Sequence, residues 1–148
     1  MTGIDTVRNF IGEKPIAVAD FDKEGKRTWL AGKEVRDNNH GVYAIIAKDD
    51  KGTIKFGSIN GGKRTIANRV TDYNNGMKSY ASSTEEFIFS LIKKHRGARL
   101  LFFPLKMRSI KQGKIVCKAS ISEQVQNACI TKYEKKYGKK PEGNKVLF

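Results

Sequence analysis

The stretch that most restricts the fold is GVYAIIAKDDKGTIKFGSI, residues 41–59. Apolar and β-branched residues dominate both of its halves, and the turn-forming cluster KDDKG separates them. The pattern predicts two antiparallel strands joined by a tight turn. Each strand carries an aromatic residue close to a glycine, Tyr43 near Gly41 and Phe56 before Gly57, which a simple hairpin does not require.

Other segments predict a further hairpin, two strands and three helices. Apolar alternation on both sides of DKEGK predicts an N-terminal hairpin within residues 15–35. Helical spacing, a capping pattern or a terminal glycine predicts the three helices, and apolar runs predict the two strands. The expected helices lie within residues 61–76, 82–97 and 120–138, and the strands at 98–105 and 114–120. The order β-β-α-α-β-β-α indicates an α+β fold.

Two residues in these segments predict particular structural features. Pro104 cannot donate to a strand ladder, so it predicts that the strand at 98–105 lies at an edge or a bulge. Arg69 shares the apolar stripe of its helix with Tyr73. A guanidinium there is costly unless it has a partner such as a bound phosphate.

The positive charge of the chain is confined to one part of it. The 148 residues contain 29 Lys and Arg against 15 Asp and Glu, a net charge of +14. Residues 1–38 hold 7 of each sign, so residues 39–148 hold 22 basic and 8 acidic side chains and carry the whole excess. This division predicts a neutral N-terminal extension and a basic domain, and it favours nucleic acid as the partner.

Cysteine content and hydropathy predict an intracellular protein, without distinguishing cytoplasm, nucleus or virion. Cys117 and Cys129 have neither zinc-site nor CxxC spacing, and we expect both to be small buried hydrophobes. With His40 and His95 they form no convincing metal site. No stretch approaches the roughly 18 apolar residues of a membrane span, and residues 1–10 lack the features of a signal peptide.

Five features of residues 39–148 follow one another in the order typical of the GIY-YIG nuclease family, which the chain resembles. They are Gly41-Val42-Tyr43, Lys55-Phe56-Gly57, Arg69, Glu123 and Asn144. The resemblance implies a small mixed sheet flanked by helices, to which residues 1–38 add a hairpin. It also implies a metal-dependent endonuclease that hydrolyses DNA, with DNA favoured over RNA.

The resemblance implies a role for each matched residue. Tyr43 would help to deprotonate the attacking water, and because a free phenol has a pKa of about 10 this requires nearby positive charge. Arg69 would neutralise charge on the phosphate, and Glu123 would bind one divalent metal ion, expected to be Mg²⁺. The glycines next to Tyr43 and Phe56 would let a phosphodiester approach the backbone.

The chain departs from the family pattern in three ways. Phe56 stands where we place the second family tyrosine, and it has no hydroxyl. The spacing from Gly57 to Arg69 is long, so Arg64 competes with Arg69 for the arginine position. No second recognition domain follows, and the expected phosphate contacts come from surrounding basic residues. These are Lys55, Lys63, Arg64, Lys93, Lys94 and Arg96.

Each matched residue also has a purely structural interpretation. Tyr43 and Phe56 suit a strand core, Glu123 is spaced from Ser120 as in a capping box, and Asn144 follows a glycine as in a turn. These interpretations support the rival hypothesis of a catalytically inactive protein that binds nucleic acid or joins a larger assembly. The N-terminal extension would then be its docking element.

Overall fold

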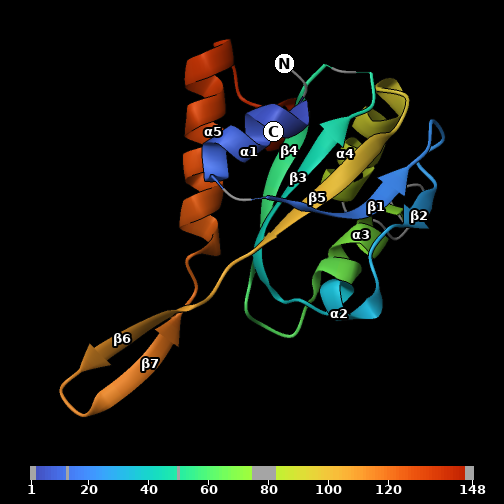
Figure 1. Cartoon of the computed structure of the whole chain (residues 1–148). Coiled ribbons are helices and arrows are strands. Elements are labelled where there is room, and N and C mark those ends of the chain that lie inside the picture. The colour runs from blue at the N-terminus through green and yellow to red at the C-terminus, as the bar shows by residue number, and fades with distance from the viewer. Residues whose placement is uncertain (1–2, 13, 50, 75–82, 146–148) are drawn as a thin grey trace.

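The computed structural model describes residues 3–12, 14–49, 51–74 and 83–145, and a five-stranded sheet organises it (Figure 1). The strand order is β2-β1-β5-β3-β4, and all four pairings are antiparallel, so the expected mixed sheet is corrected to an antiparallel one. The strands are β1 (Ile16–Phe21), β2 (Arg27–Trp29), β3 (His40–Ala47), β4 (Thr53–Asn60) and β5 (Ala98–Pro104).

Helices cover both faces of this sheet, which confirms the α+β class. They are α1 (Gly3–Ile11), α2 (Lys33–Arg36), α3 (Ile66–Asn74), α4 (Ser83–Lys94), α5 (Ser122–Tyr137) and the short 3₁₀ turn η1 (Glu142–Asn144). The three helices predicted from the sequence are α3, α4 and α5. Helix α1 was not among the predicted elements.

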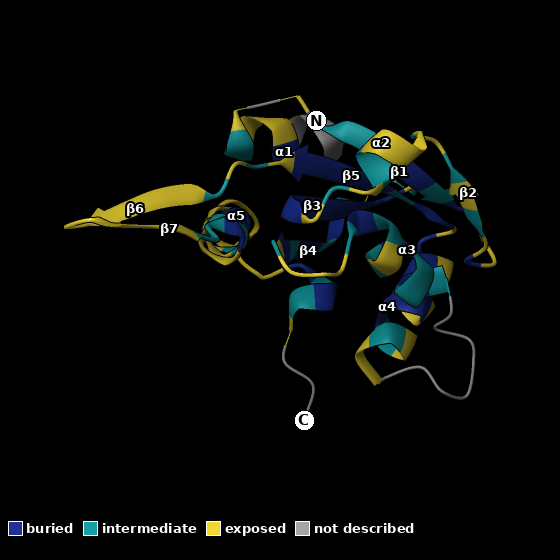
Figure 2. Ribbon diagram, turned by 90° about the horizontal axis from the view of Figure 1, so that it is seen from below, coloured by how far each residue is buried: buried dark blue, intermediate teal, exposed yellow. Residues whose placement is uncertain are grey.

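Side chains alternate along β3 and build a separate core on each face. Tyr43 and Ile45 pack with α3 and α4, whereas Ala44 and Ile46 pack with α1 and α5. Because β3 and β5 lie inside the sheet, nearly all of their residues are buried (Figure 2). The hairpin formed by β3 and β4 therefore has one aromatic residue in each core, Tyr43 in the first and Phe56 in the second.

The predicted N-terminal hairpin is present and belongs to the main sheet. β1 pairs with β5 from Ile16 opposite Phe102 to Phe21 opposite Ala98, and β2 forms the edge beyond it. The prediction that Pro104 places its strand at a sheet edge is wrong, because β5 is central, whereas the β1–β5 ladder does contain a register shift between Ala17 and Ala19. Pro104 is the last residue of β5, where the loss of one N–H is tolerated.

A second, two-stranded sheet projects from the molecule. It consists of β6 (Arg108–Gln112) and β7 (Ile115–Ala119), which pair only with each other in the described sheets. Its residues are exposed apart from half-buried Ala119, and Figure 2 shows the hairpin extending beyond the two cores. Cys117 lies here and is exposed, which corrects the expectation of a buried thiol, whereas Cys129 is buried.

Within the described part of the chain, no helix combines the length and the apolar character needed to cross a bilayer.

Candidate active site

The glycine beside each aromatic residue makes room for an aromatic ring. Tyr43 lies directly opposite Gly57 in the β3–β4 ladder, and a Cβ atom at Gly57 would overlap the Tyr43 ring. A Cβ at Gly41 would likewise collide with the carbonyl oxygen of Phe103 and the ring of Phe102. The protein's own side chains occupy the space that we expected a phosphodiester to approach, so that expectation is corrected.

This packing buries a pair of tyrosine hydroxyl groups. The Tyr43 and Tyr73 oxygens are 2.7 Å apart, and the two side chains are 0% and 1% exposed. Burial raises the pKa of Tyr73 well above its ordinary value, and the Tyr43 hydroxyl adds to this effect while Arg69 opposes it. Tyr73 therefore keeps its proton near neutral pH and can donate it in a hydrogen bond to the Tyr43 oxygen.

Arg69 joins the tyrosine pair to the surface. Its guanidinium carbon lies 5.7 Å from the centre of the Tyr73 ring, and its side chain is one-third exposed. Interaction with Tyr43 is the main cause that raises the pKa of Arg69, so the group stays cationic. Its Nη1 also lies 3.3 Å from Asp72 Oδ2, and Asp72 forms a second ion pair with Arg64.

A basic pocket of about 340 Å³ opens beside Arg69. Its lining comes from the end of β4, the loop after it and the first turns of α3. The lining residues are Ser58, Ile59, Asn60, Gly62, Lys63, Arg64 and Arg69. The two arginines that competed for one family position therefore lie in the same pocket, and Arg69 is the one next to the tyrosines.

Alternation along β4 separates Lys55 from Phe56. Lys55 lies on the Tyr43 side, with Nζ 5.8 Å from the centre of the Tyr73 ring. Burial, followed by the charge of Arg69, lowers the pKa of Lys55 to about 8. Phe56 packs in the opposite core, 6.4 Å from Phe10 and 6.2 Å from Tyr133 between ring centres. Lys55, rather than Phe56, is thus the residue of this triplet that faces the tyrosine pair.

Asn144 holds this triplet in place through the backbone of Phe56. Its Oδ1 accepts a hydrogen bond from the Phe56 N–H, and its Nδ2 donates to the Phe56 carbonyl, both at 2.8 Å. Because β4 is an edge strand, Asn144 takes the place of a neighbouring strand at this residue.

Glu123 lies in the first turn of α5, and its side chain is exposed. It forms no hydrogen bond or ion pair within the described ranges. The capping box with Ser120 is not formed, because Ile121 is the N-cap, and Ser120 Oγ accepts a hydrogen bond from the Ser122 N–H, at 3.3 Å. Ser120 Oγ also lies 3.5 Å from Asn60 Oδ1, which places the start of α5 next to a residue that lines the basic pocket.

The remaining predicted phosphate contacts fall into two groups. Lys63 lines the pocket together with Arg64. Lys93, Lys94 and Arg96 are exposed at the end of α4, near the β3–β4 turn, where the Lys48 N–H donates to the Gly97 carbonyl. The structure therefore does not bring the α4 cations to the pocket, which lies at the other end of β4.

Sequence reasoning did not identify Tyr73 or Asp72 as parts of this site. Tyr73 follows Arg69 by four residues on the helical stripe, so its nearness to Arg69 was readable from the sequence. Its contact with Tyr43 joins residues 30 positions apart and could not be read from the sequence. Among the residues that the structure describes, no three His, Cys, Asp or Glu side chains form a group that could hold a metal ion.

Comparison with known structures identifies the fold. A mutant of bacteriophage T4 EndoII is similar with a TM-score of 0.63 and 12% identity, over 96% of this chain and 98% of that one. Restriction endonuclease HPY188I in complex with product DNA aligns with a TM-score of 0.49 and 17% identity, over 99% and 93% of the two chains. The EndoII similarity shows a shared fold. No protein family and no curated protein sequence matches the chain.

Replacing Gly57 with alanine should displace the Tyr43 ring. We expect Gly57→Ala to lower the free energy of unfolding by about 1–3 kcal/mol, as an added methyl group does in a filled core. Chemical denaturation measures this value. Gly62→Ala is the matched control, because a Cβ at Gly62 meets no atom of the described residues within 4 Å. Equal stability of the two variants would contradict the proposed reason for Gly57.

The depressed pKa of Lys55 predicts a pH-dependent stability. Between pH 8 and about 10 the unfolded chain holds a proton that folded Lys55 has lost, so the free energy of unfolding rises with pH in this range. Lys55→Met should therefore be more stable than the wild type at pH 7, by on the order of 1 kcal/mol, with a difference that shrinks towards pH 10. Exposed Lys63→Met is the control. A pH-independent difference between wild type and Lys55→Met would contradict this assignment.

Proposed function

We propose that this protein is an intracellular, Mg²⁺-dependent DNA endonuclease of the GIY-YIG type. The observation that carries the proposal is the connection from the hydrogen-bonded Tyr43–Tyr73 pair through Arg69 to an open basic pocket. A structural core needs neither a buried hydroxyl pair beside a guanidinium nor a cationic pocket next to it. Hydrolysis of a phosphodiester needs both a proton acceptor and positive charge.

In this proposal the DNA phosphate occupies the pocket. Arg69 and Arg64 form charge-assisted hydrogen bonds with its oxygens and stabilise the charge that builds up in the transition state. Both guanidinium groups are bound to Asp72 in the structure, so a phosphate competes with that carboxylate for them. Movement of Arg69 towards the phosphate would open a path from the pocket to the Tyr43 oxygen.

Tyr43 is the proposed proton acceptor. In this proposal Tyr43 acts as the phenolate, after its own proton has passed to solvent, with the Tyr73 hydroxyl 2.7 Å from its oxygen and the Arg69 guanidinium beside the tyrosine pair. Tyr43 then takes a proton from the attacking water, whose oxygen forms a bond to phosphorus. The bond from phosphorus to the leaving sugar oxygen breaks, and that oxygen takes a proton from solvent.

Glu123 is the proposed metal ligand. Its exposed carboxylate forms no bond within the described chain, and α5 begins beside the pocket. This arrangement fits Mg²⁺, which keeps several waters and binds through one or two carboxylates together with substrate phosphate oxygens. When bound, such an ion supplies Lewis-acid stabilisation of phosphate charge.

Phe56 and Asn144 are proposed to position the site without contacting substrate. Their two backbone hydrogen bonds fix the edge strand from which Lys55 and Gly57 face Tyr43.

A second candidate is a DNA-binding protein with the same fold and no hydrolytic activity. It is favoured by the nearly complete burial of both tyrosines, which satisfy each other's hydroxyl groups. In this candidate the basic pocket holds a phosphate without cleaving it. The neutral residues 1–38 would dock the protein into an assembly.

Nicking of supercoiled plasmid, with Mg²⁺ and with EDTA, tests the first proposal. Tyr43→Phe should lower the rate by about 10²–10⁴, as expected for a lost acid–base group, while DNA affinity stays nearly unchanged. Tyr133→Phe is the matched control, because Tyr133 is a buried tyrosine in the core on the other face of the sheet. We expect it to nick at the wild-type rate.

Glu123→Gln provides the metal arm of the same assay. It should abolish Mg²⁺-dependent nicking, whereas Glu134→Gln, an exposed carboxylate further along α5, should not. Nicking that is unchanged in both Tyr43→Phe and Glu123→Gln would overturn the proposed mechanism. DNA binding without any nicking by the wild type would establish the second candidate.

A further inference from the structure

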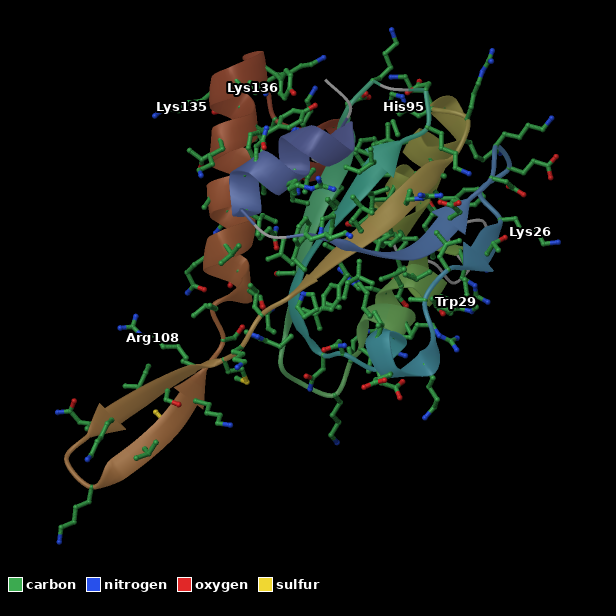
Figure 3. All side chains as sticks on the ribbon, in the orientation of Figure 1. Lys26, Trp29, His95, Arg108, Lys135 and Lys136 are labelled. Atoms are coloured by element: carbon green, nitrogen blue, oxygen red, sulfur yellow. The ribbon has the colours of Figure 1, made fainter. Side chains whose placement is uncertain are left out.

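The projecting β6–β7 hairpin carries a strong positive charge and no compensating acid. Residues 105–121 contain five Lys or Arg and no Asp or Glu. Three aliphatic residues are also exposed there, Ile110 at 42%, Ile115 at 69% and Val116 at 64%. Arg108, at the start of β6, lies on the opposite side of the molecule from Lys26 (Figure 3). Exposed aliphatic side chains on an isolated basic hairpin mark an interaction surface.

The base of this hairpin is fixed to the rim of the basic pocket. His40 is 6% exposed, and its Nδ1 lies 2.8 Å from the Leu105 carbonyl oxygen while its Nε2 lies 2.9 Å from Ser120 Oγ. Leu105 precedes β6 and Ser120 follows β7, so one imidazole binds both ends of the hairpin. Ser120 also reaches Asn60, which lines the pocket. The base of the hairpin therefore lies beside the pocket.

The strand register gives the hairpin two different faces. Residues directly opposite each other share a face, so Lys111 and Val116 lie with Ser109 and Lys118. The other face combines apolar and hydrogen-bonding side chains. It carries Arg108, Ile110, Gln112, Ile115, Cys117 and Ala119. Arginine and glutamine pair with base edges, and aliphatic groups contact the thymine methyl group.

We propose that the β6–β7 hairpin binds duplex DNA by lying in the groove next to the phosphate held in the pocket. This inference rests on the proposed function, since it concerns the same DNA. A five-residue strand spans about 17 Å, and the major groove, about 12 Å wide, admits a two-stranded β-ribbon. The Arg108 face lies against the base edges, and Lys111 and Lys118 reach the phosphates.

Charge distinguishes DNA from a second copy of this chain as the occupant. Two such hairpins packed together would bring ten cations into contact with no acid from either hairpin, and like charges at an interface are repulsive. With DNA, each lysine or arginine that contacts a phosphate releases condensed counterions, and this release favours binding.

Fluorescence anisotropy with a 30-base-pair duplex in EDTA tests this inference independently of cleavage. Lys111→Glu combined with Lys118→Glu should raise the Kd at least tenfold. It should also reduce the log–log salt slope by about 2, the value for two lost phosphate contacts. Lys23→Glu combined with Lys26→Glu makes the same charge change on the exposed β1–β2 turn and should change the Kd less than threefold.

The outcomes separate this inference from the proposed function. Equal effects of the two double variants would show that only net charge matters, and would overturn a hairpin site. Light scattering that finds a wild-type dimer, dispersed by Ile115→Ser with no loss of DNA affinity, would also overturn it in favour of a second copy. If the hairpin variant loses DNA affinity but the wild type does not nick DNA, the hairpin site is supported and the nuclease proposal is rejected. If the wild type nicks DNA but the hairpin variant binds DNA as the wild type does, the nuclease proposal is supported and the hairpin site is rejected.

Discussion

The hydrogen bond between Tyr43 and Tyr73 is the interaction on which the candidate site depends. It ties α3 to the centre of the sheet, and Gly57 permits it by leaving space for the Tyr43 ring. Once α3 is fixed in this way, Arg69 lies between the hydroxyl pair and the solvent, one turn before Tyr73. The buried Tyr43–Tyr73 contact therefore determines that the Arg69 guanidinium lies beside the tyrosine hydroxyl groups. The rest of the pocket comes from the end of β4 and the loop between β4 and α3.

The edge strand β4 is held by contacts that are distant in the sequence. Asn144 binds the Phe56 backbone across 88 residues, and the Phe56 ring fills the core beneath α1 and α5. At the C-terminal end of the strand, Ser120 and His40 connect Asn60 to the base of the projecting hairpin. Lys55 and the pocket thus lie on a strand that is supported near its middle and at its C-terminal end. Such support is what a preorganised site requires.

Local sequence patterns predicted most of the helices and strands. The candidate site depends on contacts between residues far apart in the sequence, which local patterns do not predict. The alternation in residues 41–59 and the stripe of Ile66, Arg69, Val70 and Tyr73 correspond to β3–β4 and α3. The sequence could not show that Tyr43 and Tyr73 meet, because their contact depends on how α3 packs against the sheet. The glycines suggested an open backbone, whereas long-range packing fills that space.

Apolar residues also gave a wrong expectation of burial in the exposed β6–β7 sheet. Ile115, Val116 and Cys117 have the composition of a core strand, yet β7 has no partner except β6 in the described chain. Conversely, β5 was expected at an edge because of Pro104, although that residue only ends a central strand. Strand order is a tertiary property, and neither propensity nor a single proline determines it.

A crystal structure of the Tyr43→Phe protein bound to duplex DNA tests the central claim most directly. The account predicts one backbone phosphate in the pocket of Ser58, Arg64 and Arg69, within hydrogen-bonding distance of the Arg69 guanidinium. It also predicts that the introduced phenylalanine ring stays in the space at Gly57 and faces that phosphate. DNA bound with no phosphate in this pocket, or along the α4 cations at the other end of β4, would contradict it.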